Sequence, residues 1–327
     1  MASPWDLLHA TWLAVLGTAT AGAASAPSAL PPDAETAAGW VKCQGNPVLG
    51  GPLGTCFDVA VLKTADTYRM WFSWRPRKSI ALAESKDGMH WTEPAIVLGP
   101  NAATDWEADV NRPGVVERAD GYHMWYTGQA RGHSWIGYAT SPDGRAWKRM
   151  SPRPVLSPEQ PWEKVAVMCP HVLWDEEAKL FRVWYSGGEQ HEPDAIGYAT
   201  SPDGLAWRKL DGNPIFRADP AGEWEKHKVT ACQVVRHGEW HLMFYIGFRD
   251  EHHAQIGVAR SRDGITAWER LPANPIIRPG EGKWDHDACY KPYALWDGAR
   301  WLLWYNGRHG GLEQIGLAMH DGEDLGL

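Results

Sequence analysis

The sequence predicts an all-β fold built from repeated four-stranded units, and three observations support this prediction. First, the phrase Ser-x-Asp-Gly-x-x-Trp recurs at residues 85–91, 141–147 and 201–207, with a copy one residue longer at 261–268. The copies lie about 60 residues apart, and a period of this size indicates a repeat architecture. Second, short β-prone runs separated by turn residues surround each copy. Third, the repeats contain no convincing amphipathic helix.

Each repeat is predicted to contain four strands. The first is apolar, as in residues 113–116 (PGVV), and the second is aromatic and ends in a turn, as in 125–128 (WYTG). The third is rich in small residues, as in 136–140 (IGYAT), and the fourth begins at the tryptophan of the motif.

The two ends of the chain indicate how the repeats are arranged. Residues 40–49 (WVKCQGNPVL) have the layout of the fourth strands at 147–156 and 207–216, although no repeat precedes them. The last repeat, by contrast, ends at Leu327 without its tryptophan strand. An N-terminal strand that completes the last sheet would close a ring and remove exposed sheet edges. We therefore predict a five-bladed β-propeller of four-stranded blades, with residues 38–327 forming a single domain.

Composition and charge limit the classes of partner. The net charge is −8 and there is no basic run, so nucleic acid is not an expected partner. The five cysteines match no zinc motif. Cys43 and Cys56 are the candidates for a disulfide if the protein is exported, whereas Cys169 and Cys232 are expected to be buried as small apolar side chains.

Residues 1–37 precede the repeats and are interpreted as a leader, either a secretory signal peptide or a disordered segment. Residues 11–25 are apolar and rich in small side chains, and they run into a small-residue cleavage pattern at 24–26. The segment is too short and too rich in Gly and Thr for a membrane-spanning helix. We expect a secreted or periplasmic protein; the alternative is a cytoplasmic one. The sequence does not indicate an oligomeric state.

The candidate site follows from the places where the repeats differ. In a propeller the starts of the innermost strands face the axis, where a concave pocket is the default binding site. Sister repeats carry different residues at these starts, and several are polar: Asp58, Asp109, Arg112, His227, Asp287 and Lys291. The loops between second and third strands share this face and add further charged residues, among them Arg75, Arg131, Glu189 and Arg308. Carboxylates near cations and aromatic rings predict a pocket for a carbohydrate or another polyol.

An acidic residue directly after a tryptophan is shared by four repeats: Glu107, Glu163, Glu225 and Asp285. Because it recurs, we interpret it as a structural tie rather than as part of a catalytic site.

The repeated IGYATSPDG..W phrase, the NPVL and NPIF strand ends and the WYxG turns resemble the five-bladed glycosidase superfamily over residues 38–327. This superfamily comprises glycoside hydrolase families 43, 32 and 68 and the mannoside phosphorylases and hydrolases of family 130. The resemblance implies an aspartate base on blade one, a second aspartate on blade two and a glutamic acid proton donor on blade three.

Asp58 fits the first of these places. On blade two the Arg-Asp-Pro of the superfamily resembles Asn111-Arg112-Pro113, so the aspartate is displaced and Asp109 is the nearest substitute. On blade three Glu-Cys-Pro resembles Met168-Cys169-Pro170, so the usual donor is missing and Glu189 is the candidate replacement.

Three functions remain open from the sequence. The first is an inverting glycoside hydrolase, in which Asp58 activates water and Glu189 or Asp109 donates the proton. The second is a glycoside phosphorylase, in which Arg112, His227, Lys291 and Arg308 would hold phosphate. The third is a non-catalytic sugar-binding propeller. No cofactor is expected to be required; some members of the superfamily hold a calcium ion near the axis, and the sequence leaves a metal ion open.

Overall fold

The computed structural model describes residues 34–327, so the signal-like segment at 11–25 lies outside the described residues. The regular secondary structure of the described residues consists of β-strands and a few short helices. Three short 3-10 helices occur, η1 (Gly51–Leu53), η2 (Arg75–Arg77) and η3 (Pro161–Glu163). None of the helices in residues 34–327 has the length and hydrophobicity needed to cross a membrane.

The strands form sheets whose order follows the sequence repeat. The first sheet contains β2 (Cys56–Thr64), β3 (Thr67–Trp74), β4 (Ser79–Ser85) and β5 (Ala95–Leu98). Another contains β15 (Lys228–His237), β16 (Trp240–Phe248), β17 (Ala254–Ser261) and β18 (Glu269–Arg270). Within each sheet, strands that follow one another in sequence pair antiparallel.

A nine-stranded sheet lies between these two in sequence and consists of two repeats. The first is β6 (Asp109–Arg118), β7 (Gly121–Ala130), β8 (His133–Ser141) and β9 (Lys148–Arg149). The second is β10 (Ala166–Asp175), β11 (Leu180–Gly188), β12 (Ala195–Ser201), β13 (Arg208–Lys209) and β14 (Phe216–Arg217). One parallel pair, Ala166 with Ser134, joins the two halves.

The last sheet combines both ends of the described chain. It contains β19 (Ala288–Trp296), β20 (Arg300–His309), β21 (Leu312–Asp321) and, from the N-terminal side, β1 (Trp40–Lys42). Trp40 pairs with His320 and Lys42 with Ala318, and Leu49 forms a further bridge to Ile315. The stretch 40–49 therefore occupies the outer position that the sequence assigned to it.

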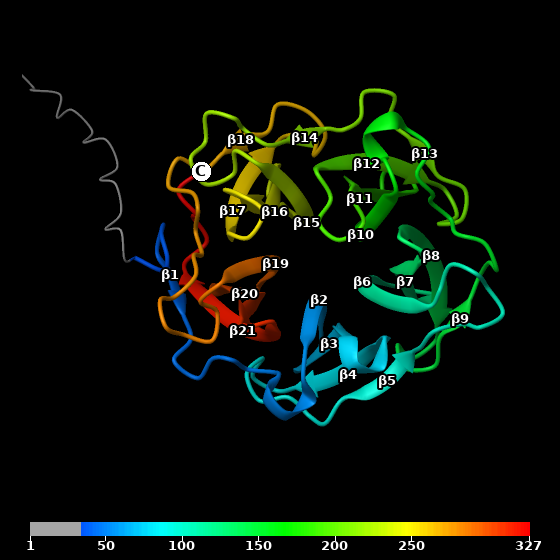
Figure 1. Cartoon of the computed structure of the whole chain (residues 1–327), viewed down its shortest axis with the longest axis horizontal. Helices are drawn as coiled ribbons and strands as arrows, with labels where there is room; N and C mark the ends of the chain where they lie inside the picture. The colour runs from blue at the N-terminus through cyan, green and yellow to red at the C-terminus, as the bar shows by residue number, and fades with distance from the viewer. Residues whose placement is uncertain (1–33) are drawn as a thin grey trace, which may run out of the picture.

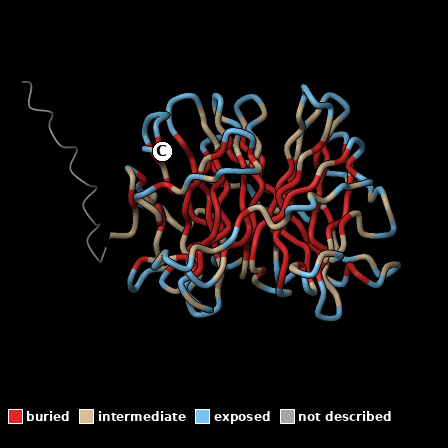
Figure 2. Tube along the Cα trace, turned by 90° about the horizontal axis from the view of Figure 1, so that it is seen from above, coloured by how far each residue is buried: buried red, intermediate tan, exposed pale blue. Residues whose placement is uncertain are grey.

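The sheets follow one another around a common centre in the arrangement of a β-propeller (Figure 1). Strands β2, β6, β10, β15 and β19 lie innermost, and the short fourth strands lie at the periphery. Buried residues fill the middle of the molecule, and exposed residues gather in the turns at its two faces (Figure 2). The second strands contribute fully buried tryptophans to the packing between sheets: Trp71, Trp125, Trp184 and Trp304.

The repeated motif links each of these tryptophans to the next repeat around the ring. Oγ of Ser201 accepts a hydrogen bond from the backbone N–H of Gly204, and Oδ1 of Asp203 accepts the N–H groups of Leu205 and Ala206, so the turn is closed by its own side chains. The carbonyl of Gly204 then accepts the indole N–H of Trp125 from the preceding repeat at 3.0 Å. Equivalent bonds join Trp71 to Gly144, Trp184 to Gly264 and Trp304 to Gly88. The last of these joins the final sheet to the first.

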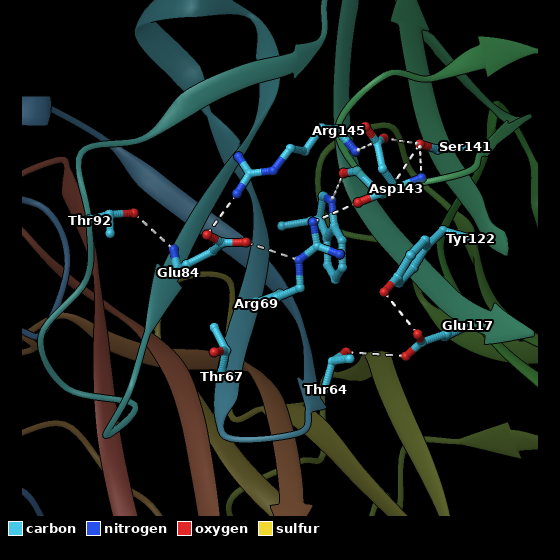
Figure 3. A network of polar contacts seen from close by, with 12 residues as sticks. Thr64, Thr67, Arg69, Glu84, Thr92, Glu117, Tyr122, Ser141, Asp143 and Arg145 are labelled. Atoms are coloured by element: carbon cyan, nitrogen blue, oxygen red, sulfur yellow. Dashed lines mark hydrogen bonds and ion pairs between the residues drawn. The ribbon is translucent and has the colours of Figure 1, made fainter.

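Charged side chains add to the same contact between the first two sheets (Figure 3). Arg69 donates to the carboxylate of Glu84 at 3.2 Å and to the carbonyl of Asp143 in the motif turn at 2.7 Å. Arg145 pairs with the other oxygen of Glu84 at 2.7 Å. These contacts lie beside the C-terminal end of β2, so they support the face opposite the starts of the inner strands.

The acidic residue shared by four repeats is a structural tie, as the sequence indicated. Glu107 accepts hydrogen bonds from the hydroxyl of Tyr126 at 2.7 Å and from Arg149 at 2.6 Å. Glu163 is bound in the same way by Tyr185 and Lys209. Each carboxylate thus connects the second and fourth strands of its repeat while buried, and burial of a charge requires such partners.

The cysteines are all free thiols. Cys43 is half-buried, and the other four, including Cys56, are buried. Cys43 and Cys56 therefore form no disulfide.

Candidate active site

The inner strands share one irregularity at the place where they approach the axis. The register of each inner strand against its neighbour shifts at a β-bulge. At each bulge one residue has a left-handed backbone: Asp58 (φ 53), Arg112 (φ 53), Cys169 (φ 54), Ala231 (φ 35) and Lys291 (φ 54). This conformation costs a non-glycine residue about 1–3 kcal/mol, so it persists only where surrounding contacts enforce it.

The enforcing contacts come from the preceding repeat. The backbone N–H of Asp58 donates to Oδ1 of Asn306, and that of Arg112 donates to Oγ of Ser73. Thr127 accepts from Cys169 and Ser186 accepts from Ala231 in the same way. Three of these acceptors are the polar residues of the WYTG, WYSG and WYNG turns, and Ser73 has the same place in the WFSW segment of the first repeat. The sequence showed the turns without revealing that they hold the axial residues.

The bulges bring these side chains together around one cavity. Its volume is about 50 Å³, and its lining is Asp58, Val59, Arg112, Pro113, Gly114, Cys169, Pro170, His171, Ala231, Cys232, Gln233, Lys291, Pro292 and Tyr293. Three residues predicted for the site, Asp58, Arg112 and Lys291, therefore meet at the axis.

The charges in the cavity are one carboxylate and two cations. Oδ2 of Asp58 lies 3.4 Å from Nε of Arg112, and Oδ1 lies 3.7 Å from Nζ of Lys291. All three side chains are buried. Neither oxygen of Asp58 accepts a hydrogen bond from any other residue among 34–327. Because buried polar atoms are nearly always satisfied, this carboxylate is arranged to accept hydrogen bonds from a ligand or water.

Both cations remain charged although they are buried. Burial opposes the charge of Arg112, but the Asp58 carboxylate and other nearby acidic groups outweigh it, so the pKa of Arg112 is raised. The pKa of Lys291 is raised in the same manner against its burial, because the carboxylate of Asp58 faces it. Nζ of Lys291 also lies 3.4 Å from Sγ of Cys169. Burial raises the pKa of that thiol, so Cys169 is held as the neutral thiol and is a poor nucleophile.

Asp109 lies one step away from the axial cavity. It accepts a hydrogen bond from Nδ2 of Asn111 at 2.8 Å, and Oδ1 of Asn111 accepts from Arg112 at 2.7 Å. Gln129 joins the same chain through Asn111 at 2.8 Å. Asp109 therefore acts on the cavity through Asn111 and Arg112 rather than lining it.

Glu189 and Arg131 point away from the cavity. Glu189 is 60% exposed and pairs with Lys164 at 2.9 Å, and exposed Arg131 pairs with Asp105 at 2.9 Å. His227 is also exposed. These three residues do not line the axial cavity.

The remaining predicted residues also lie outside the lining of the axial cavity. The guanidinium of Arg75 stacks over Phe57, with 4.2 Å between Cζ and the ring centroid, and pairs with Glu313. Arg308 donates to the carbonyl of His252 at 3.0 Å, and Asp287 accepts from the N–H of Gly310. Arg308 and Asp287 help to line a second cavity of about 450 Å³ together with His252, His253, His286 and Gly311.

Glu192, which the sequence did not single out, belongs near the axial group. It is half-buried in the loop between β11 and β12, and its Oε2 is buried without a hydrogen-bond partner among the described residues. The loop contains two glutamates within SGGEQHEP, and no periodicity there indicates which of them turns inward.

The axial residues do not fit a calcium ion. Calcium takes about 6–8 oxygen ligands, whereas here Arg112 and Lys291 flank the single carboxylate of Asp58. Within residues 34–327, no group of three or more His, Cys, Asp or Glu side chains is placed to hold a metal ion.

Solved glycosidases share the fold. A structure described as a glycoside hydrolase has a TM-score of 0.71 at 18% identity and covers 89% of this chain and 92% of its own. A thermostable family-43 glycoside hydrolase gives 0.68 at 18% identity, covering 85% and 93%. A structure from work on β-1,2 mannosidic linkages and the GH130 family of mannoside phosphorylases gives 0.70 at 16%, covering 91% and 99%.

Sequence comparison gives two further relatives and a family. The uncharacterized protein MT1551 of Mycobacterium tuberculosis (strain CDC 1551 / Oshkosh) is 26% identical over 171 residues, 50% of this chain and 56% of that protein. Rv1502 of strain ATCC 25618 / H37Rv matches equally, so the chain spans about half the length of these curated relatives. The family model of the glycosyl hydrolases family 32 N-terminal domain matches residues 60–228. This match extends over more than half of the chain, which therefore belongs to that glycosyl hydrolase family.

Proposed function

We propose that this protein hydrolyses a glycosidic bond of an oligo- or polysaccharide, with Asp58 as the general base in the axial pocket. The observation that carries the proposal is the Asp58 carboxylate, whose two oxygens are buried at the axis and accept no hydrogen bond from residues 34–327. Membership of a glycosyl hydrolase family supports the substrate class.

The cavity volume bears on what binds beside Asp58. Liquid water occupies about 30 Å³ per molecule, whereas pockets for small organic ligands measure about 300–1,000 Å³. A cavity of about 50 Å³ therefore suits water rather than a sugar ring. In this proposal the sugar binds at the mouth of the cavity, above the bulges, and water lies between the sugar and Asp58.

The reaction inverts the anomeric centre. Water attacks the anomeric carbon while Asp58 takes one of its protons, the carbon–oxygen bond to the leaving sugar breaks, and an acid protonates the leaving oxygen. The products are two free hydroxyls, and solvent returns the proton from Asp58 to the acid. Inverting enzymes keep base and acid about 6.5–9.5 Å apart to leave room for the water.

Arg75 and Arg308 are proposed to bind substrate hydroxyls at the mouth. Both lie beside aromatic residues that precede the bulges: Arg75 stacks over Phe57, and Arg308 lies 6.0 Å from the ring centroid of Tyr290. Planar guanidinium groups fixed in this way offer several donors at low entropic cost.

Phosphorolysis is the second candidate, favoured by the two buried cations. Arg112 and Lys291 both face Asp58, and a phosphate in place of water would pair with them. The structural likeness to a protein of the mannoside phosphorylase family supports the same alternative.

We also infer that the chain forms five blades. The two halves of the nine-stranded sheet meet through one residue pair, and each half has its own bulged inner strand. Counted as separate blades, they give five equivalent inner strands.

The test is turnover of aryl glycosides and oligosaccharides, with and without phosphate, by the wild type, Asp58→Asn and a matched Asp66→Asn control. Asp66 is exposed in the turn between β2 and β3 at the opposite face. We expect phosphate-independent hydrolysis that falls about 10²–10⁴-fold in Asp58→Asn only.

Thermal unfolding and calorimetric binding of product sugar separate lost chemistry from lost structure. Phosphate-dependent turnover would establish phosphorolysis instead. Sugar binding without any turnover by the wild type would show a non-catalytic propeller. Full activity of Asp58→Asn would refute the assignment of the base.

A further inference from the structure

The loop at residues 189–194 crosses the site face above the inner strand of its own repeat. It joins β11 to β12, and two neighbours hold it from opposite sides. The side-chain amide of Gln129, on β7, donates to the carbonyl of Gln190 at 3.4 Å. Nζ of Lys228, the first residue of β15, donates to the carbonyl of Glu192 at 3.1 Å. The loop is therefore anchored to β7 of the preceding repeat on one side and to β15 of the following repeat on the other.

These anchors place the loop next to the axial charges. Gln129 is also 3.4 Å from NH1 of Arg112, so the first anchor touches a cation of the cavity. Lys228 begins the strand that supplies Ala231 to the cavity lining. Between the two anchors lies β10, which places Met168 and Cys169 at the axis. Met168 is fully buried and has no proton to give to a leaving group.

The two glutamates of the loop have opposite environments. Glu189 is exposed and paired with Lys164. Glu192 is half-buried, the next residue Pro193 is buried, and Oε2 of Glu192 is buried without accepting a hydrogen bond from the described residues. A buried carboxyl oxygen without a partner in the protein is available to an oxygen of the substrate, which is the contact that a proton donor must make.

The charges of the cavity agree with this placement. Glu192 is among the acidic groups that raise the pKa of Arg112 and of Lys291 against their burial, and Asp58 acts on both in the same direction. Asp58 and Glu192 thus lie near the same pair of cations, and of the two only Asp58 pairs with them directly.

We propose that Glu192 is the proton donor of the site, in the role expected of Glu189 from the sequence. This inference rests on the proposed hydrolysis. As water adds to the anomeric carbon and gives a proton to Asp58, the Glu192 carboxylic acid gives its proton to the departing oxygen and becomes a carboxylate. The proton on Asp58 then returns to Glu192 through solvent, which restores both groups.

The experiment compares Glu192→Gln with Glu189→Gln on aryl glycosides of graded leaving-group acidity. Removal of an acid slows poor leaving groups strongly and good ones little. We expect Glu192→Gln to lose about 10²–10⁴-fold in kcat/KM on a poor leaving group. We also expect near wild-type rates on a dinitrophenyl glycoside and loss of the alkaline limb of the pH profile. Glu189→Gln should show no dependence of its rate ratio on the leaving group.

Glu176→Gln is the matched control, because Glu176 is exposed in the turn between β10 and β11 and pairs with Lys179. An equal loss on all leaving groups, or none, in Glu192→Gln would overturn the assignment, as would the leaving-group signature in Glu189→Gln. If Glu192→Gln does not fold, Glu192→Asp replaces it and should lose activity on poor leaving groups alone. A wild type without turnover on any glycoside would instead refute the proposed function.

Discussion

Nζ of Lys42 lies 2.6 Å from Oδ2 of Asp285, so the strand from the N-terminal side is tied to the last sheet by a buried ion pair. The side chain of Asp285 is 0% exposed and also accepts from the hydroxyl of Tyr305 at 3.1 Å. Lys42 occupies the place that Arg149, Lys209 and Arg270 hold for the other repeats.

The variant Lys42→Met should therefore destabilise the protein strongly. It leaves the Asp285 carboxylate buried without its cation, which typically costs about 3–5 kcal/mol. Urea unfolding followed by tryptophan fluorescence measures the change. Lys86→Met is the control, since Lys86 pairs with Asp66 in full solvent exposure and its loss should leave the midpoint unchanged. Equal midpoints for the two variants would contradict the tie.

Gly204→Ala should be destabilising by about 2 kcal/mol or more, because a side chain there is both strained and obstructed. Gly204 has φ 77, and an added Cβ would lie 2.7 Å from Cζ2 of Trp125. The neighbouring Gly212→Ala tests the reasoning, as nothing lies within 4 Å of its added Cβ. The difference in free energy of unfolding between the two variants is the quantity to measure. Comparable stabilities would show that the motif turn does not hold the sheets together.

His171 should make the protein less stable in acid. Burial lowers its pKa to about 4, and its Nε2 donates to the carbonyl of Val234 at 2.8 Å. In the unfolded chain the imidazole of His171 has an ordinary pKa of about 6.5, so it binds a proton in a pH range where the native state does not. Stability therefore falls as the pH drops from about 6.5 to about 4. The loss amounts to about 3 kcal/mol.

His171→Gln removes the contribution of His171 to the pH dependence of stability. Urea unfolding at pH 7 and pH 4.5 should show a smaller loss of stability in His171→Gln than in the wild type. His90→Gln, at an exposed position, should follow the wild type. An unchanged pH dependence in His171→Gln would mean that His171 is protonated in the native state.

Native thiol labelling should modify Cys43 alone. Burial raises the pKa of Cys56 to about 12 and that of Cys232, Cys169 and Cys289 above the ordinary value, whereas Cys43 is half-buried. Because the thiolate is the reactive form, a disulfide reagent at neutral pH should titrate one thiol per chain. In urea it should titrate all five. Rapid reaction of more than one thiol in the native protein would contradict the described burial.

Much of the arrangement of strands could be predicted from the sequence because each repeat carries the same residues at its turns and strand ends. The side chains of Ser201 and Asp203 close one turn around Gly204, and the same residues recur in each copy of that turn. The placement of residues 40–49 followed from the same comparison. Asp58, Arg112 and Lys291 were found because they depart from a shared pattern at a position that faces the axis.

The loops were not predictable by this route. Glu189 and Glu192 are separated by two residues in a segment without periodicity, and their burial depends on anchors from Gln129 and Lys228, which are distant in sequence. His227 was grouped with the axial residues because it precedes a strand start, but this strand lines the cavity only from Ala231 onward, four positions later. Register shifts of this kind arise from contacts between sheets.

The left-handed positions on the inner strands have a consequence for how such proteins diversify. Their backbone is fixed by hydroxyl and amide groups of the adjoining sheet, such as Ser73 and Thr127, and not by the axial side chains themselves. The axial side chains can therefore be exchanged while the backbone keeps its conformation: Asp, Arg, Cys, Ala and Lys occupy the equivalent bulge positions of one molecule. Substitutions can therefore change or remove the reactive side chains at the axis without altering the sheets. Solved glycosidases share this fold at 16–18% identity, as expected if the backbone is fixed by one set of residues and the axial side chains vary independently.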